Sequence, residues 1–208
     1  MTAGRSIERL SLYRRLLQGC LAQGRRHIFS HQLAALASGT GAQVRRDIMA
    51  IGYSGSPNYG YDVARLIGAI GEVLDTPEGD NVVLLGVGNL GRALLAYFSG
   101  RHPRLRVVGA FDVDPNRVGR VIHGCRCYPV EELGAVVRRE NVVVGILAVP
   151  ATEAQKAVDR MYEAGIRGVL NFAPMPLAVP KDMFVERMDV TTALEKVAYF
   201  ARQQVGTS

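Results

Sequence analysis

The stretch Val82-Val-Leu-Leu-Gly-Val-Gly-Asn-Leu-Gly-Arg-Ala-Leu94 joins an apolar run of strand length to a helical pattern through the spacing G-x-G-x-x-G. Gly86 permits a tight turn, Gly88 lets the backbone approach a pyrophosphate, and Gly91 allows the helix to pack closely on the strand. The free amides at the start of the helix would receive the anion. The stretch therefore predicts a dinucleotide-binding site, and a glycine-rich turn without a ligand is the structural alternative.

A carboxylate follows at the spacing that such a site requires. The next apolar run ends in Phe111-Asp112, and Asp112 lies twenty-one residues after Gly91. An acid there accepts hydrogen bonds from an adenosine ribose and repels a 2′-phosphate. We therefore expect NAD(H) as the cofactor, while the nearby Arg117 keeps NADP(H) open as an alternative.

Apolar runs of strand length alternate with helical patterns after residue 80. The expected strands are 82–85, 105–111, 142–149, 167–172 and 184–187. The expected helices are 90–99, 153–164 and 192–201. This alternation predicts an α/β fold with a Rossmann-type, doubly wound parallel sheet covered on both sides. The sheet uses nearly all of this half and leaves no room for a substrate domain. We therefore expect no catalytic residue and a nucleotide that stays unchanged.

The cysteines and the apolar runs exclude other classes. His123-Gly-Cys-Arg-Cys127 has the residue types of a metal site but no convincing fourth ligand, so reduced thiols are the preferred interpretation. Three cysteines, an odd number, fit a reduced cytoplasmic chain. The longest apolar run, Val142–Ala151, has ten residues and is too short to span a bilayer. Residues 1–10 lack the apolar core of a signal peptide.

Before residue 75 the apolar pattern is helical. Ile7, Leu10, Leu17 and Leu21 mark the buried stripe of a first helix, which Gly24 closes. These positions predict a long helix that packs by one side against the rest of its domain.

Two further helices and a hairpin follow in this half. Ser30 is the expected cap of a short second helix, and Thr40 with Gln43 form a predicted capping box before the third. The segment Tyr53–Tyr61, called the wing below, predicts a hairpin before a fourth helix over 63–74. Together these elements predict a winged-helix domain with a helix-turn-helix.

A polar linker over 75–80, with a proline and a glycine, separates the two halves. The predicted domains are 1–76 for the winged helix, 80–188 for the Rossmann domain and 189–208 for a C-terminal helix.

The positive charge is confined to the first domain. Residues 1–61 hold eight arginines against Glu8 and Asp47, a net charge of +6, whereas the other 147 residues hold 17 basic and 17 acidic side chains. Such asymmetry indicates that one half meets a polyanion. A basic solvated face is the alternative. With 48% hydrophobic residues, the chain is too apolar for intrinsic disorder.

The third helix has the pattern of a DNA recognition helix. If Val44, Ile48 and Ile51 face inward, then Ala42, Gln43, Arg45 and Arg46 face outward near its first turns. Arginine pairs bidentately with guanine and glutamine with adenine. A helical domain that serves oligomer contacts, with solvated arginines, is the alternative interpretation.

The chain as a whole resembles the Rex family of redox-sensing transcriptional repressors. The stretches that carry the resemblance are Gln32-Leu33 through Gln43–Asp47, Gly60-Tyr61, Gly86–Gly91, Phe111–Pro115, Ala148–Pro150, Gly165–Pro174 and Val179-Pro180. The resemblance implies a homodimer with an exchanged C-terminal helix, bound to palindromic double-stranded operator DNA and released when NADH accumulates.

The resemblance, together with the motifs, assigns three groups of residues. The cofactor-binding residues are Gly86, Val87, Gly88, Asn89, Leu90, Gly91, Tyr97, Asp112, Val113, Val149, Pro150 and Asn171. The DNA-binding residues are Ser30, Gln32, Thr40, Ala42, Gln43, Arg45, Arg46, Ser56, Asn58 and Tyr59. Arg15 and Asp189 are implied as the interdomain switch, with Tyr97 beside them.

Two departures from the family pattern keep alternatives open. The wing lacks the usual Lys or Arg before Gly60, and Val190 stands where the family has an aromatic residue at the nicotinamide. A diverged nucleotide-binding paralogue without specific DNA binding is therefore the second hypothesis. A small NAD-dependent oxidoreductase is the third.

Overall fold

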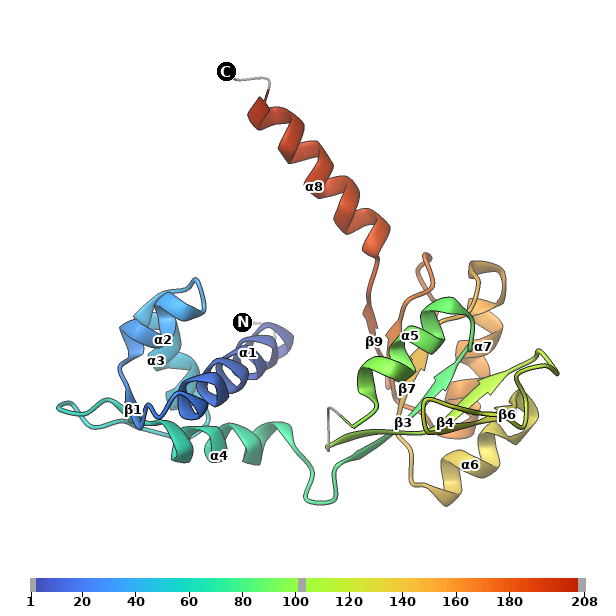
Figure 1. The fold of residues 1–208 in the computed structure, drawn as a ribbon, viewed down its shortest axis with the longest axis horizontal. Helices are drawn as coiled ribbons and strands as arrows, with labels where there is room; N and C mark the ends of the chain where they lie inside the picture. Colours follow the sequence, from blue (N-terminus) through green and yellow to red (C-terminus); the bar gives the residue numbers. More distant parts are fainter. Residues whose placement is uncertain (1–2, 101–103, 206–208) are drawn as a thin grey trace. The chain divides into compact units, whose positions relative to one another are not determined.

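A computed structural model describes residues 3–100 and 104–205 of the chain, which forms two compact units that divide between Pro77 and Glu78. The first unit is mainly helical (Figure 1). Its elements are α1 (Ala3–Ala22), β1 (His27–Ile28), α2 (Ser30–Leu36), α3 (Gly41–Ala50), β2 (Tyr61–Asp62) and α4 (Val63–Leu74). The expected winged-helix architecture is thus confirmed.

The buried side of α1 differs from the predicted stripe. Leu10 and Leu17 are buried as expected, but Ile7 and Leu21 are 45% and 43% exposed. Tyr13 and Cys20 are buried instead, because Leu10, Tyr13, Leu17 and Cys20 follow one another at spacings of three, four and three residues and therefore lie on one helical face. The prediction failed for Ile7 and Leu21, at the two ends of the stripe, and it left Tyr13 and Cys20 out of the core.

The caps of α2 and α3 correct two further expectations. Ser30 lies inside α2, whose N-cap is Phe29, and the amide of Phe29 donates to Gln32 Oε1 at 3.0 Å. Thr40 caps α3 as predicted, with Oγ1 accepting from the Gln43 amide at 3.2 Å. The Gln43 side chain does not complete the capping box, because it bonds Asp47 and Arg46 instead.

The wing is a short turn supported by a two-stranded sheet. Ser56 and Gly60 form a β-bridge inside it, and β2 at its end pairs antiparallel with β1. The β1 strand escaped the sequence analysis because two residues are too few for an apolar period. The predicted hairpin at this position is confirmed.

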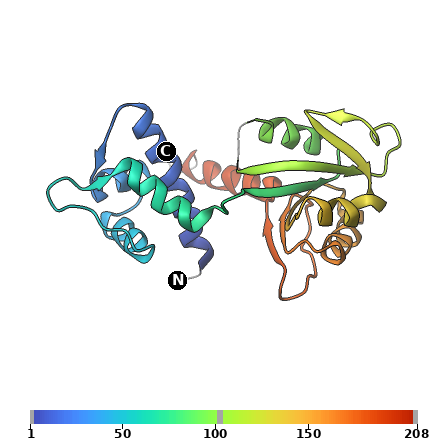
Figure 2. The same ribbon diagram turned by 90° about the horizontal axis from the view of Figure 1, so that it is seen from below.

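The second unit is a sheet of parallel strands with one short antiparallel edge strand, β5, and helices on both faces (Figure 2). Its strand order is β5-β6-β4-β3-β7-β8-β9. The strands are β3 (Asp80–Leu85), β4 (Leu105–Asp112), β5 (Val121–Ile122), β6 (Cys125–Pro129), β7 (Val144–Leu147), β8 (Gly168–Asn171) and β9 (Phe184–Arg187). The helices are α5 (Asn89–Phe98), η1 (Val130–Glu132), α6 (Leu133–Arg139), α7 (Ala151–Ala164) and α8 (Val190–Val205).

Alternating side chains of β3 divide the core of this unit into two layers. Val82 and Leu84 pack on the side of α5, whereas Val83 and Leu85 pack on the side of α6 and α7. Because a strand buried on both faces needs apolar residues at every position, the run is continuous. The Rossmann-type sheet is therefore confirmed, while β5, β6 and α6 were not predicted.

The last helix of the first unit, α4, provides a test of its core. Ile70 is fully buried on α4, and Val73, one turn away, is 47% exposed. We expect Ile70→Ala to lower the free energy of unfolding by about 2–5 kcal/mol, because it leaves a cavity. Val73→Ala should change it by no more than about 0.5 kcal/mol. Urea unfolding followed by far-UV circular dichroism measures both, and equal losses would contradict the assigned core.

Candidate nucleotide-binding and DNA-binding sites

The G-x-G-x-x-G turn joins β3 to α5 and depends on two close backbone approaches. Gly86 has a φ of 93°, and its amide donates to the Phe111 carbonyl at 2.8 Å. A Cβ on Gly86 would overlap the Ala148 carbonyl oxygen, and one on Gly91 would overlap the carbonyl oxygen of Gly86. Both positions therefore require glycine, as the motif predicted.

Gly88 differs from these two glycines because it faces open space. It is the N-cap of α5, no side chain of the described residues accepts a bond there, and a Cβ would have no atom within 4 Å. An anion can thus approach the backbone without obstruction and meet the free amides of the first helical turn. The geometry fits a pyrophosphate.

The parallel sheet brings most of the predicted cofactor residues to one edge, whereas Tyr97 lies in the last turn of α5. Leu85, at the end of β3, is in register with Phe111 on one side and Leu147 on the other. The strands are parallel, but the order in which they are added reverses at β3: β4 lies on one side of it and β7 on the other, so this edge has the switch point where open α/β sheets bind ligands. The segments that follow β3, β4, β7 and β8 all leave from it.

Asp112 is buried at this edge and is already bonded to the glycine turn. Its Oδ2 accepts from the Val87 amide at 2.7 Å and from Arg117 Nη1 at 3.0 Å, and its Oδ1 accepts from the Asp114 amide at 2.9 Å. Burial raises the pKa of this carboxyl, but the two amides and Arg117 outweigh that effect and hold the pKa below its ordinary value. Asp112 is therefore an ionised acceptor.

The remaining predicted cofactor residues differ in exposure. Val113, Tyr97 and Pro150 are exposed, and Val149 is half-buried. Asn171 is buried, and its amide group bonds the loop after β8 through Met175 O and Ala173 N. The structure thus gives Asn171 a structural role that the sequence did not indicate. Its contact with a cofactor stays a prediction.

The outer face of α3 presents basic side chains. Ala42, Arg45 and Arg46 are exposed as the apolar period required, whereas Gln43, also expected to face outward, is half-buried and bonds Asp47. Met49 is 70% exposed on the same helix and was missed. Its position three residues after Arg46 was the signal that could have identified it.

Three predicted DNA-binding residues near this helix have local partners. Arg45 Nη1 donates to Ser30 Oγ at 3.0 Å, so Ser30 supports an arginine rather than capping α2. Gln32 accepts from the backbone of α2's cap, and Thr40 caps α3. These contacts fix the turn that presents α3.

The predicted DNA-binding residues of the wing, Ser56, Asn58 and Tyr59, are exposed, whereas Tyr61 at its end is buried. The Ser56 hydroxyl accepts from the Asn58 amide at 3.3 Å, and Tyr59 lies 6.0 Å from the ring of His27 on β1. His27 was not predicted, because nothing in the local sequence relates it to the wing. Its imidazole and the Tyr59 ring give the wing an aromatic surface in place of a cation.

Asp189 caps α8 and was expected as a switch residue. It accepts from the Thr192 amide at 2.9 Å, from the Thr192 hydroxyl at 2.8 Å and from Arg187 Nη2 at 2.6 Å. These bonds, led by the Thr192 amide, lower the pKa of Asp189 to about 2. Arg15 is exposed on α1, in the other unit, and the pairing of Arg15 with Asp189 stays a prediction.

The cysteine cluster has the character of packed thiols. Cys125 and Cys127 are buried in β6, and burial raises the pKa of Cys125 to about 11. Among residues 3–100 and 104–205, no three His, Cys, Asp or Glu side chains are grouped so that they could hold a metal. Within the same part of the chain, every helix is too short or too polar to cross a membrane.

Family models match both units. Residues 3–48 match the model described as "Putative DNA-binding protein N-terminus", and residues 78–175 match that of the CoA binding domain. The first match contains all but the last two residues of α3, and the second contains the glycine turn and Asp112.

Whole-chain comparisons point to one family. Redox-sensing transcriptional repressors Rex from Listeria welshimeri and Lactobacillus gasseri are 39% and 36% identical over 195 residues, which is 94% of this chain and 91% of each relative. The crystal structure of RSP in complex with β-NAD+ and operator DNA matches with a TM-score of 0.90 and 30% identity, covering 98% of this chain and 94% of that one. RSP in complex with β-NADH matches with a TM-score of 0.85 and 29% identity. By sequence and by fold, this chain belongs to the Rex family of redox-sensing transcriptional repressors.

Proposed function

We propose that this protein represses transcription by binding operator DNA through its first unit and releases it when NADH binds its second. The observation that carries the proposal is that one chain has two surfaces, one suited to DNA and one suited to a dinucleotide. These are the exposed arginine face of α3 and the open backbone at Gly88 with the ionised Asp112 beside it. The proposed response to the nucleotide is supported by a relative, since RSP was crystallised with β-NAD+ and operator DNA and also with β-NADH.

The nucleotide site favours NAD(H). The amides at the start of α5 would hold the pyrophosphate, and Asp112 would accept from the adenosine ribose. Arg117 is engaged by both Asp112 and Asp114, at 3.0 and 3.2 Å, so it is not free to receive a 2′-phosphate. Val113, Val149 and the residues after them would line the rest of the nucleotide.

The bound nucleotide acts as a signal, and we propose no reaction. For NADH to release the DNA, it must bind the DNA-free state of the protein more tightly than the DNA-bound state, because a ligand shifts an equilibrium only by its difference in affinity for the two states. NAD+ must lack this preference. The switch would use Asp189, which exchanges Arg187 for Arg15, with Tyr97 beside the pocket. The site of action would be the cytoplasm, where the operator lies.

A homodimer is part of the proposal. On α8, Val190, Leu194, Val197 and Phe200 are all more than half exposed and are spaced by four, three and three residues. Such a stripe lies on one side of a helix and needs a covering surface. The proposed cover is a second copy of the chain, exchanged through residues 189–208, and its twofold axis would match a palindromic operator.

One observation favours a second candidate, a nucleotide-binding paralogue without specific DNA binding. The wing has no Lys or Arg among residues 53–61, and minor-groove binding normally depends on such cations. A small oxidoreductase has less support, since the parallel sheet and its helices take up the second unit and leave no separate substrate domain.

DNA selection from a random pool tests the proposed function. We expect the wild-type protein at physiological salt to enrich a palindrome whose half-sites lie one or more helical turns apart. NADH should abolish the enrichment and NAD+ should retain it. Failure to enrich any sequence over competitor DNA would favour the paralogue. Enrichment that ignores both nucleotides would mean that the second unit answers to another ligand.

Asp112→Ala tests the nucleotide site. Loss of the ribose acceptor and of the Val87 anchor should weaken NADH binding at least about tenfold, since hydrogen bonds to charged groups contribute about 1.5–3 kcal/mol. Asp159→Ala, at an exposed acid in the middle of α7, is the matched control and should stay within about twofold of the wild type. Titration of NADH fluorescence measures both. An unchanged dissociation constant in Asp112→Ala would show that the ribose contact is misassigned.

A further inference from the structure

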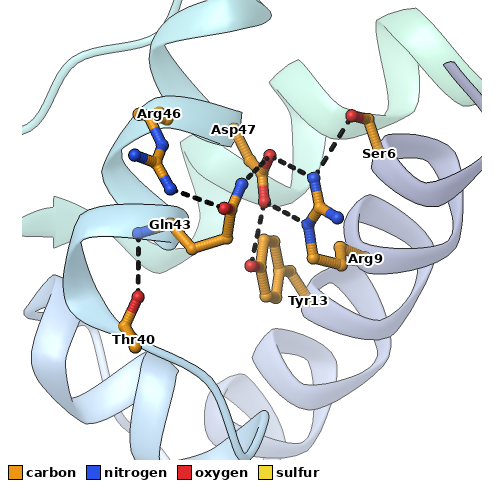
Figure 3. Close-up of polar contacts among 7 residues, drawn as sticks. All are labelled: Ser6, Arg9, Tyr13, Thr40, Gln43, Arg46 and Asp47. Carbon is orange, nitrogen blue, oxygen red and sulfur yellow. Dashed lines mark hydrogen bonds and ion pairs between the residues drawn. The ribbon is translucent and has the colours of Figure 1, made fainter. Parts of the chain in front are cut away.

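The buried side of α3, the predicted recognition helix, is held to α1 by the carboxylate of Asp47 (Figure 3). Asp47 accepts from Arg9 on α1 through both oxygens, at 2.6 Å from Nε to Oδ2 and 2.7 Å from Nη2 to Oδ1. Tyr13, also on α1, donates its hydroxyl to Oδ2 at 3.1 Å. Asp47 is 5% exposed, so these bonds replace its water.

This carboxylate can only accept hydrogen bonds. Burial by itself raises the pKa of Asp47, but hydrogen bonds from Arg9, Gln43 and Tyr13 outweigh it and hold the pKa below the ordinary value. Asp47 is therefore ionised at neutral pH. An ionised carboxylate has no proton to donate, so any amide that faces it must present its NH2 group.

Gln43 is oriented by that requirement. Its Nε2 donates to Asp47 Oδ1 at 2.9 Å, which turns the other end of the amide, Oε1, away from the carboxylate. Oε1 accepts from Arg46 Nη2 at 2.7 Å, and Thr40 fixes the Gln43 backbone amide (Figure 3). A chain of hydrogen bonds thus runs from α1 through Asp47 and Gln43 to the exposed guanidinium of Arg46.

Two consequences follow for DNA binding. An arginine held in one orientation loses less side-chain entropy when it contacts a guanine, so the held form binds better. Gln43 makes a bidentate contact with an adenine only if both ends of its amide face the base. Here Nε2 is committed to Asp47 and Oε1 to Arg46.

We infer that Gln43 is a positioning residue for Arg46, oriented by Asp47, and that it sets specificity at the base pair contacted by Arg46 rather than at one of its own. The inference rests on the proposed function, since it assumes that α3 enters the major groove. It differs from the expectation drawn from the sequence, in which Gln43 contacts an adenine independently.

The test compares single and double variants of the full chain by DNA selection and by affinity for every single-base change in the enriched site. Arg46→Ala should relax preference at one base pair of each half-site. Gln43→Met, which keeps the length of the side chain and its helix propensity, should relax the same base pair by about tenfold. The double variant should relax it no further than Arg46→Ala alone, because the two residues act as one unit.

Two control variants separate positioning from folding. Gln18→Met changes an exposed glutamine of α1 and should leave every preference unchanged. Ile70→Val removes one buried methyl group from α4 and should lower the stability while leaving the preferences unchanged. Thermal unfolding of each variant verifies that the helices are intact. A loss of stability alone would not change which base pair is relaxed, so the identity of that base pair distinguishes positioning from folding.

Three results would overturn the inference. Relaxation by Gln43→Met at a different base pair, additive with Arg46→Ala, would show that Gln43 contacts its own base. Unchanged preferences in Gln43→Met would show that the bond to Arg46 has no role in binding. Failure of the wild-type chain to enrich any sequence would instead overturn the proposed function, and this inference with it.

Discussion

The bond between the Asp112 carboxylate and the Val87 amide, at 2.7 Å, is the contact on which the second unit's candidate site depends. It joins the end of β4 to the turn after β3, and thereby fixes the open backbone of Gly88 next to an ionised acid. Arg117 compensates the charge, so the carboxylate is held inside the fold at a pKa below its ordinary value. One acid therefore serves the geometry of the glycine turn and the proposed recognition of the ribose.

A second buried carboxylate, that of Asp47, likewise joins two elements in the first unit. Asp47 binds α1 to α3 through Arg9 and Tyr13, and its remaining contact orients Gln43. Loss of Arg9 would leave the buried Asp47 carboxylate without its compensating charge, which is why the pair holds the two helices together. The position of α3 is thus set by electrostatics at its back as well as by the apolar residues Val44 and Ile48.

The proposed switch residue, Asp189, has a different arrangement of partners. Asp189 already has three donors, from Thr192 and Arg187, and it caps α8 with them. A switch that uses Asp189 must therefore exchange partners rather than fill an empty position. The apolar stripe of α8 adds a surface that a second chain would cover, which links the proposed dimer to the same helix.

The sequence by itself determined the features that depend on neighbouring residues. The glycine turn, the alternation of strands and helices, and the outward face of α3 are periodic or contiguous patterns, and the backbone geometry of one element dictates them. Family membership also followed from such stretches. The strands missed are β1 and β5, whose two residues are too few to establish a period, and β6, whose residues Cys-Arg-Cys-Tyr-Pro do not form a continuous apolar run.

Only the tertiary structure decided which polar side chains bind one another. Asp47 meets Arg9 and Tyr13 across 38 and 34 residues of chain, and Asp112 meets Val87 across 25. Ser30 supports Arg45 rather than a helix end. These partners come together because packing places distant elements side by side, and once a carboxylate is buried it must take whatever donors that packing supplies. No local pattern carries that information.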